Sequence, residues 1–331
     1  MSDSPITCSV DLNQPGRNLG VIRVPHSVHR SAYGHIPVPV ASIVGEKPGP
    51  SVLLMAGNHG DEYEGQIILS ELIRSIDPAQ VSGKLVMLPM ANFAAAEAGL
   101  RTSPLDSGNL NRSFPGVPLG QPTEMTAYYI EHVLMPGVDV FIDLHSGGSS
   151  LYCLPFAMTM AEDGDKYADL RRAILYALGL PVVLWHGSEK SGWYSTSAAA
   201  RAGAVGFTLE LGGGGTVDPK IRQGAQAGVL RALAAIGLYD ANLPTLRLAG
   251  KLREFFAEDL IYADEAGLYE PLAVSGEDVE AGQPAARIHF PDRPGREPVA
   301  VAFTRPGTIV AHRVPARVLR GDCLFHMVYP E

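Results

Sequence analysis

The sequence predicts an α/β layer fold, in which helices flank a mixed, mostly parallel sheet and a small all-β domain follows. Three observations support this prediction. Nearly continuous apolar runs bounded by turn residues are typical of strands buried on both faces. Segments with helical spacing alternate with these runs, which favours βα units. Near residue 244 the helical spacing ends, and short strand-like pieces separated by turns take over.

The elements can be placed in chain order. Strands are predicted at 51–56, 84–90, 138–144, 180–185 and 204–211. The first helix carries Ile68, Leu72 and Ile76 on one face, and the second begins at Pro122. Two further helices are predicted over 169–178 and 223–236. In such sheets, functional sites form in the loops at the carboxyl ends of strands.

Two domains are expected from this organisation. The first covers residues 1–244 and is the expected catalytic domain, with about the first 45 residues as a β-rich lead-in. The composition changes at Leu243-Pro244-Thr245. The second domain, residues 245–331, is predicted to be all-β because glycine-containing turns recur between its short apolar segments.

The composition indicates a compact metabolic protein. Hydrophobic residues make up 46% of the 331 residues and charged residues 18%, which excludes a disordered chain. The net charge is −9 and no run of Lys or Arg occurs, so nucleic acid is not an expected partner. The sequence shows neither a secretory signal nor an apolar stretch of membrane-spanning length. Three scattered cysteines fit a cytoplasmic location. A small-molecule partner is expected, and a homodimer is compatible with the sequence.

Two strand ends carry residues suited to a metal. His59 and Glu62 follow the first predicted strand, and His145 ends the third. Two histidines and one Glu form the ligand set of a catalytic zinc site, which leaves a position open for water. The same set could accept Co²⁺ or Mn²⁺. Taken alone, His59 and Glu62 also fit a loop histidine beside a solvated carboxylate. Asp143 either orients a ligand through a hydrogen bond or caps a turn.

Glu210 ends the fifth predicted strand, just before four consecutive glycines. A carboxylate at the end of a hydrophobic strand is costly unless it has a partner or a task. Beside a metal site, a Glu can act as the general base that takes a proton from water and passes it to a leaving amine. The alternative is that Glu210 caps the following helix.

The polar loop 99–116 contains two arginines. The planar fork of Arg112 suits a carboxylate, so Arg112 together with Asn111 is a candidate anchor for an amino-acid carboxylate. Arg101 is a candidate for polarising a scissile carbonyl. The alternative is that both arginines only tie the loop to acidic neighbours.

The motifs together resemble those of the succinylglutamate desuccinylase/aspartoacylase family, in the zinc carboxypeptidase-like superfamily. They occur in the family order: Asn58-His59-Gly60-Asp61-Glu62, Asn109-Leu110-Asn111-Arg112, Asp143-Leu144-His145 and Glu210-Leu211-Gly212-Gly213. The resemblance covers about residues 45–330. It implies one zinc ion on His59, Glu62 and His145, with Glu210 as general base, Arg101 as carbonyl-polarising group, and Asn111 and Arg112 as carboxylate anchor. Asn109 stands where the family usually has Asp.

The C-terminal segment resembles a biotinyl/lipoyl-like β domain. The modified Lys of true carriers would lie just before Pro306-Gly307, where this chain has Phe303-Thr304-Arg305, so a carrier role is disfavoured. In the family this domain narrows the active-site entrance. The run from Glu210 to Gly215 and the segment from Arg287 to Pro291 are similar to the ectoine-degradation deacetylases, which remove acetate from Nα-acetyl-2,4-diaminobutyrate.

The expected function is therefore that of a cytoplasmic zinc amidohydrolase that deacylates a small N-acyl amino acid, with Nα-acetyl-L-2,4-diaminobutyrate as the expected substrate. One alternative is the specificity of a succinylglutamate desuccinylase, an aspartoacylase or a metallocarboxypeptidase. Another is a non-catalytic metal-binding scaffold. Retention of Glu210 argues against the scaffold, because a site that only binds has no need for a base.

Overall fold

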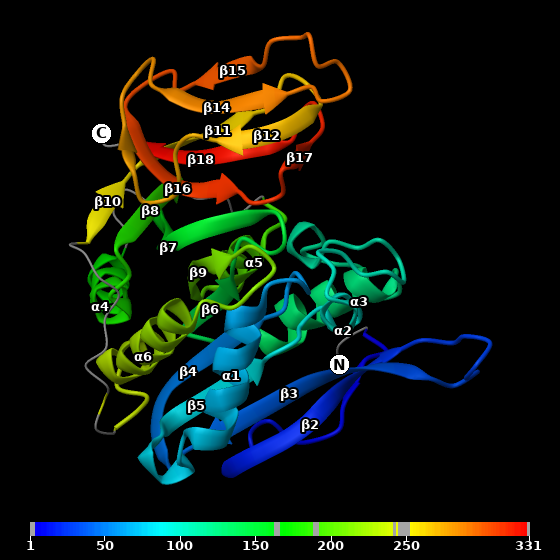
Figure 1. Ribbon diagram of the computed structural model, residues 1–331. Helices are drawn as coiled ribbons and strands as arrows, with labels where there is room; N and C mark the ends of the chain where they lie inside the picture. The colour runs from blue at the N-terminus through cyan, green and yellow to red at the C-terminus, as the bar shows by residue number, and fades with distance from the viewer. Residues whose placement is uncertain (1–3, 162–165, 188–191, 241–242, 244–251, 330–331) are drawn as a thin grey trace.

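The computed structural model describes residues 4–161, 166–187, 192–240, 243 and 252–329 (Figure 1). The first strands are β1 (Thr7–Cys8), β2 (Gly16–Pro25), β3 (His35–Val44), β4 (Lys47–Ala56), β5 (Ser82–Leu88), β6 (Val140–His145), β7 (Leu151–Ala161), β8 (Val182–Gly187) and β9 (Val205–Gly213). The helices are α1 (Tyr63–Ser75), α2 (Phe93–Ala98), α3 (Pro122–Tyr129), α4 (Ala168–Leu178), α5 (Ser195–Ala202) and α6 (Pro219–Ala235). Short 3₁₀ turns cover Pro78–Gln80 and Leu110–Arg112, and a π-helical turn, Ile130–Leu134, extends α3.

The central sheet has the neighbour order β1-β2-β3-β5-β4-β6-β9-β7. Strands β5, β4, β6 and β9 are mutually parallel, whereas β3 and β7 join this group antiparallel. The register places Ala56 of β4 opposite Leu144 of β6, and His145 opposite Glu210 of β9. The prediction of a mixed sheet is confirmed, but it is parallel only in its centre, because the pairs β1-β2, β2-β3, β3-β5 and β9-β7 are antiparallel. Its register brings the candidate site residues to one edge.

Two hydrophobic cores explain why the central strands read as continuous apolar runs. Along β4, Val52 and Leu54 pack into a core with α1, α4 and α6, whereas Leu53 and Met55 pack into a second core with α3 and α5. Side chains alternate between the two faces of a strand, so a strand that is covered on both faces needs apolar residues at every position.

Strand β7 was not among the predicted strands. Pro155 interrupts its sequence, and Pro within a run argues against a central strand because it has no N–H to donate. The structure accommodates this proline by a shift in the register with β9 between Cys153 and Phe156. The sequence pattern also did not predict the helices α2 and α5. It indicated only a β-rich segment where β2 and β3 form a long hairpin.

The C-terminal strands are β10 (Arg253–Phe255), β11 (Ala257–Tyr262), β12 (Gly267–Pro271), β13 (Asp278–Val279), β14 (Pro284–His289), β15 (Val299–Ala302), β16 (Gly307–Arg313), β17 (Arg317–Val318) and β18 (Cys323–Tyr329). Strands β15, β14, β12 and β17 form a separate antiparallel sheet. The small C-terminal β unit is therefore confirmed. The proposed boundary at Pro244 and Thr245 lies outside the described residues.

The two parts of the chain share a sheet, which the sequence did not predict. Strand β16 pairs antiparallel with β7, with Ala311 opposite Cys153, and the sheet continues through β18 to β11. Strand β10 also pairs with β8. Arg305, near the position where a carrier would hold its Lys, lies with its guanidinium carbon 3.2 Å from the Tyr329 ring centroid.

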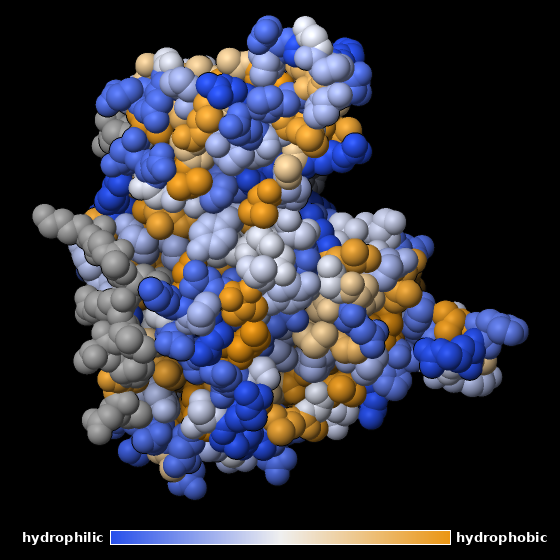
Figure 2. All heavy atoms as spheres, viewed as in Figure 1, coloured by the Kyte–Doolittle hydropathy of each residue, from blue (hydrophilic) through white to orange (hydrophobic). Residues whose placement is uncertain are grey.

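The surface carries hydrophilic and hydrophobic residues side by side. The hairpin of β2 and β3 projects from the body of the molecule (Figure 1), and its outer end is mostly hydrophilic on the face that Figure 2 shows. Among the described residues, no helix combines the length and apolar character that crossing a membrane requires. Cys8, Cys153 and Cys323 are free thiols.

Candidate metal centre

The three predicted metal ligands meet at the carboxyl ends of two neighbouring strands. His59 and Glu62 lie between β4 and α1, where Glu62 is the N-cap residue, and His145 is the last residue of β6. One potential ligand atom from each residue lies within 4.8 Å of the others. His59, Glu62 and His145 are only 3%, 2% and 2% exposed. The parallel pairing of β4 with β6 creates this convergence from positions more than eighty residues apart.

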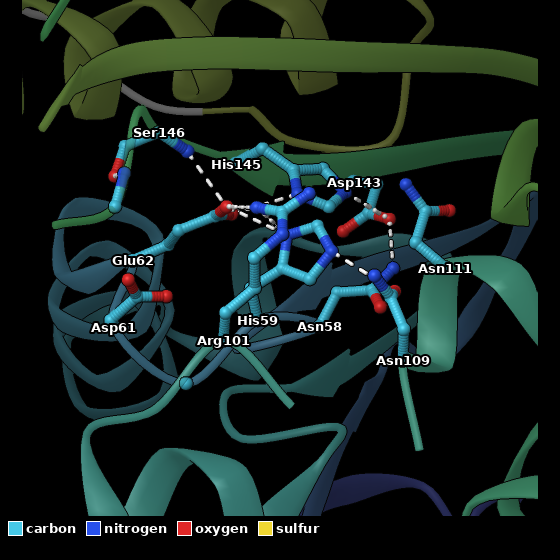
Figure 3. Close-up of polar contacts among 12 residues, drawn as sticks. Asn58, His59, Asp61, Glu62, Arg101, Asn109, Asn111, Asp143, His145 and Ser146 are labelled. Atoms are coloured by element: carbon cyan, nitrogen blue, oxygen red, sulfur yellow. Dashed lines mark hydrogen bonds and ion pairs between the residues drawn. The ribbon is translucent and has the colours of Figure 1, made fainter. Parts of the chain in front are cut away.

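The Glu62 carboxylate faces both imidazole rings from one side (Figure 3). Its Oε1 is 2.7 Å from Nδ1 of His59, and its Oε2 is 2.8 Å from Nδ1 of His145. Burial alone would raise the pKa of Glu62, but the two histidines lower it well below its usual range. An ionised carboxylate and two imidazole nitrogens that face one point form a donor set suited to a divalent cation.

The outward-facing ring nitrogens have partners of their own. Nε2 of His59 lies 3.2 Å from Oδ1 of Asn109, and Nε2 of His145 lies 2.9 Å from Oδ2 of Asp143. With Nε2 carrying the proton, each ring donates to its oxygen partner and leaves Nδ1 free for a metal. Asn109 keeps an acceptor oxygen at the position where the family usually has Asp. This contact of Asn109 was not predicted, whereas an orienting contact of Asp143 was one of the two stated alternatives.

Burial opposes protonation of His145, but Asp143 and Glu62 hold the pKa of this imidazole well above its usual range. The Ser146 N–H also donates to Oε2 of Glu62 over 3.2 Å. The carboxylates of Asp143 and Glu62 therefore both lie against the His145 ring. A divalent cation bound by the cluster would neutralise part of their negative charge.

Two acids of the same motif have structural tasks that sequence reasoning missed. Asp61 accepts hydrogen bonds from the backbone N–H and the hydroxyl of Ser149, both at 2.8 Å. Glu64 is fully buried and accepts a long hydrogen bond of 3.5 Å from the Asp218 N–H. A Cβ on Gly212, whose φ is +72°, would lie 3.0 Å from Oε1 of Glu64. The only signal in the sequence was the presence of two further acids close to Glu62.

Glu210 lies on β9 beside the metal centre, opposite His145 on one side and Phe156 on the other. Among the described residues, its carboxylate has no hydrogen-bond or ion-pair partner. Burial has the largest influence on its pKa and raises it; Glu62 and Asp143 act in the same direction, whereas His145 and Arg101 oppose them. The resulting pKa is about 8. A carboxyl group with a raised pKa and no partner is suited to exchanging protons with a substrate or water.

Arg101 reaches the rim of the centre from loop 99–116. Its Nη1 lies 3.5 Å from Oε1 of Glu62 and 3.4 Å from Nδ1 of His59, and its side chain is 49% exposed. Glu62 is therefore an acidic neighbour that holds the Arg101 guanidinium. This agrees with the alternative that the arginines tie the loop to acidic neighbours. Its exposure also leaves donors available to an oxygen that approaches the metal centre.

Asn111 and Arg112, the candidate carboxylate anchor, contact the start of α5. Oδ1 of Asn111 accepts from the backbone N–H of Ser195 over 2.9 Å, and the Arg112 guanidinium lies 4.6 Å from the Tyr194 ring centroid. Burial is the main cause that lowers the pKa of Arg112, and Arg101 acts in the same direction. Among the described residues, Arg112 has no carboxylate partner. Arg112 is exposed to solvent, and a guanidinium that stacks on a ring without a counter-ion is suited to binding an anion.

Comparisons with known proteins agree with this arrangement. The family model of the succinylglutamate desuccinylase/aspartoacylase catalytic domain matches residues 48–236. The chain is 36% identical over 327 residues to the N-alpha-acetyl-L-2,4-diaminobutyric acid deacetylase of Halomonas elongata, and the match covers 97% of this chain and 94% of that protein.

Solved structures are similar over nearly the whole chain. A succinylglutamate desuccinylase from Silicibacter sp. TM1040 is 32% identical with a TM-score of 0.92, over 99% of this chain and 100% of that one. The product-bound ectoine utilization protein EutE (DoeB) from Ruegeria pomeroyi is also 32% identical, with a TM-score of 0.91 over 98% of this chain and 99% of that one.

Proposed function

Because this chain belongs to the succinylglutamate desuccinylase/aspartoacylase family of amide-cleaving hydrolases, we propose that it is a zinc-dependent deacetylase of Nα-acetyl-L-2,4-diaminobutyrate. The observation that carries this proposal is a single composite site. A His₂Glu donor set lies beside a carboxyl group with a raised pKa, and Ser195 links Asp143 of this centre to Asn111, the neighbour of Arg112. These are the parts that hydrolysis of an acylated amino acid requires.

The residues His59, Glu62 and His145 would hold the zinc ion. When bound, the ion would polarise the amide carbonyl and acidify both water and neighbouring groups. Arg112, with the Asn111 amide, would pair with the α-carboxylate and fix the amide relative to Glu210. Arg101 would donate to the carbonyl oxygen, which becomes negative as the carbon turns tetrahedral.

Glu210 would perform both proton transfers. Its carboxylate takes a proton from the attacking water while the water oxygen bonds to the acyl carbon. The same proton then passes to the amide nitrogen as the C–N bond breaks, which releases acetate and the free amino group. The absence of any partner for Glu210 among the described residues supports this role, because the carboxylate does not have to break an ion pair before it can accept a proton.

The choice of substrate rests on relatives. A relative at 36% identity is named for this acetylated diamino acid, and EutE, a protein of ectoine utilization, matches over nearly its full length. A curated succinylglutamate desuccinylase from Pseudomonas syringae matches at 30% identity over only 50% of each chain. A cytoplasmic location fits the three free thiols.

The test is a substrate panel with zinc-loaded protein. We expect acetate release from Nα-acetyl-2,4-diaminobutyrate with a kcat/KM at least about tenfold above those for N-acetylaspartate and N-succinylglutamate. Equal or higher kcat/KM for succinylglutamate would replace the proposal by a desuccinylase function. Cleavage of dipeptides with a free carboxyl terminus would instead indicate a carboxypeptidase. A folded, zinc-loaded protein inactive on every acylated substrate would support the scaffold.

A further inference from the structure

We propose that Ser195, the first residue of α5, is a positioning residue that orients the metal ligand His145 through its hydroxyl and the carboxylate-anchoring loop through its N–H. This inference rests on the proposed metal site but not on the identity of the substrate. Ser195 is 1% exposed, and neither the sequence motifs nor the proposed chemistry assigns it a task.

The Ser195 hydroxyl contacts the carboxylate that lies against the proposed metal ligand His145. Ser195 Oγ donates to Oδ2 of Asp143 over 2.6 Å, and the same oxygen lies 2.9 Å from Nε2 of His145. Asn58 Nδ2 also donates to this oxygen over 2.9 Å (Figure 3). The other oxygen, Oδ1 of Asp143, is buried and has no hydrogen-bond partner among the residues that the structure describes. The donors on Oδ2 therefore determine how this carboxylate is turned, and its orientation sets that of the His145 ring.

The backbone contact leads to the substrate anchor. The Ser195 N–H donates to Oδ1 of Asn111 over 2.9 Å, and the ring of the preceding residue, Tyr194, stacks against Arg112. One dipeptide at the start of α5 thus contacts both anchor residues and the carboxylate that holds a metal ligand. Since α5 packs its next turn into the core through Ala198 and Ala199, the dipeptide is held by the body of the fold.

The two contacts can be separated by mutation, because a side-chain change leaves the N–H in place. Ser195→Ala removes only the hydroxyl contact. Ser197→Ala is a matched control, since Ser197 lies in the same helix, is fully buried, and has an Oγ without a hydrogen-bond partner in the described part of the chain. Zinc affinity is measured by competition with a chromophoric chelator, and KM and kcat are measured with the zinc-loaded protein.

We expect Ser195→Ala to weaken zinc binding by about 10–100-fold, the effect typical of losing a partner of a metal ligand. KM for the α-carboxylate substrate should change less than about twofold, because the contact with Asn111 remains. Ser197→Ala should match the wild type in zinc affinity. In an Asp143→Ala background, Ser195→Ala should have no further effect, because the hydroxyl acts through that carboxylate.

Zinc affinity of Ser195→Ala within about twofold of wild type would overturn the inference. So would an equal loss in Ser197→Ala, or losses that add to those of Asp143→Ala. A wild-type protein that binds no zinc would contradict the proposed metal site itself, and this result is distinguishable because it appears before any variant is compared.

Discussion

Replacing Glu210 by Gln separates the proposed base from a merely structural carboxylate. The amide keeps the shape of the side chain but cannot accept a proton from water. In the zinc-loaded protein we expect kcat to fall by about 10²–10⁴-fold with zinc content unchanged, the usual range for a positioned acid–base group. Activity of the wild type should also fall on acidification, because only the ionised form of Glu210 is a base.

The raised pKa of Glu210 also predicts that this residue lowers the free energy of unfolding of the metal-free protein at high pH. The pKa rises from 4.5 to about 8 on folding, so the folded state binds this proton more tightly than the unfolded state. Below pH 4.5 Glu210 is protonated in both the folded and the unfolded state, so it does not lower the free energy of unfolding. The cost in free energy of unfolding grows as the pH rises to about 8, where it is fully present. At about 1.4 kcal/mol per unit, its upper limit is about 5 kcal/mol.

Urea unfolding of chelator-treated protein at pH 5 and pH 9 measures this cost. Glu210→Gln should raise the free energy of unfolding relative to wild type at pH 9, and should raise it much less at pH 5. The matched control is Glu280→Gln, which changes an exposed carboxyl group on the β domain and should leave both values unchanged. A folded, zinc-loaded Glu210→Gln variant with wild-type turnover would refute the mechanism, and a loss of stability at pH 9 would refute the electrostatic reasoning.

Three further outcomes follow from the site. Removing the metal with a chelator should abolish activity and added Zn²⁺ should restore it, whereas a His145→Ala variant should not recover, because one of three ligands is missing. Arg112→Ala should weaken binding of substrates with a free α-carboxylate by about 1.5–3 kcal/mol, whereas their esters should bind nearly as well as to wild type; equal losses for both would exclude the anchor. Asp61→Ala should lower the free energy of unfolding by about 1–3 kcal/mol in urea titrations, because the N–H and the hydroxyl of Ser149 both lose their acceptor; unchanged stability would show that this contact is not needed.

The fold class was predictable because burial on both faces leaves a direct trace in the sequence. Strands β4, β6 and β9 appeared as apolar runs since each of their faces meets a layer of helices. Strand β7 lies in the same sheet but was missed, because Pro155 resembles a strand breaker and the compensating register shift depends on its neighbour β9. The pairing of β16 with β7 could not be predicted from the sequence, because backbone pairing between distant segments places little demand on side chains.

The candidate ligands were identifiable from the sequence for a related reason. His145 ends a buried strand, His59 follows one, and Glu210 lies near the end of one; polar residues at such positions are unusual enough to stand out. By itself the sequence determined which residue types stand at the carboxyl ends of neighbouring parallel strands, because local periodicity defines where those strands end. Only the tertiary structure decided which ring nitrogen faces the centre, that Asn109 and Asp143 contact the other one, and that Ser195 contacts both Asp143 and the carboxylate anchor. The physical reason is that, apart from the local contact of Asp143 with His145, these hydrogen bonds join segments tens of residues apart. No periodicity along the chain records a contact of that kind.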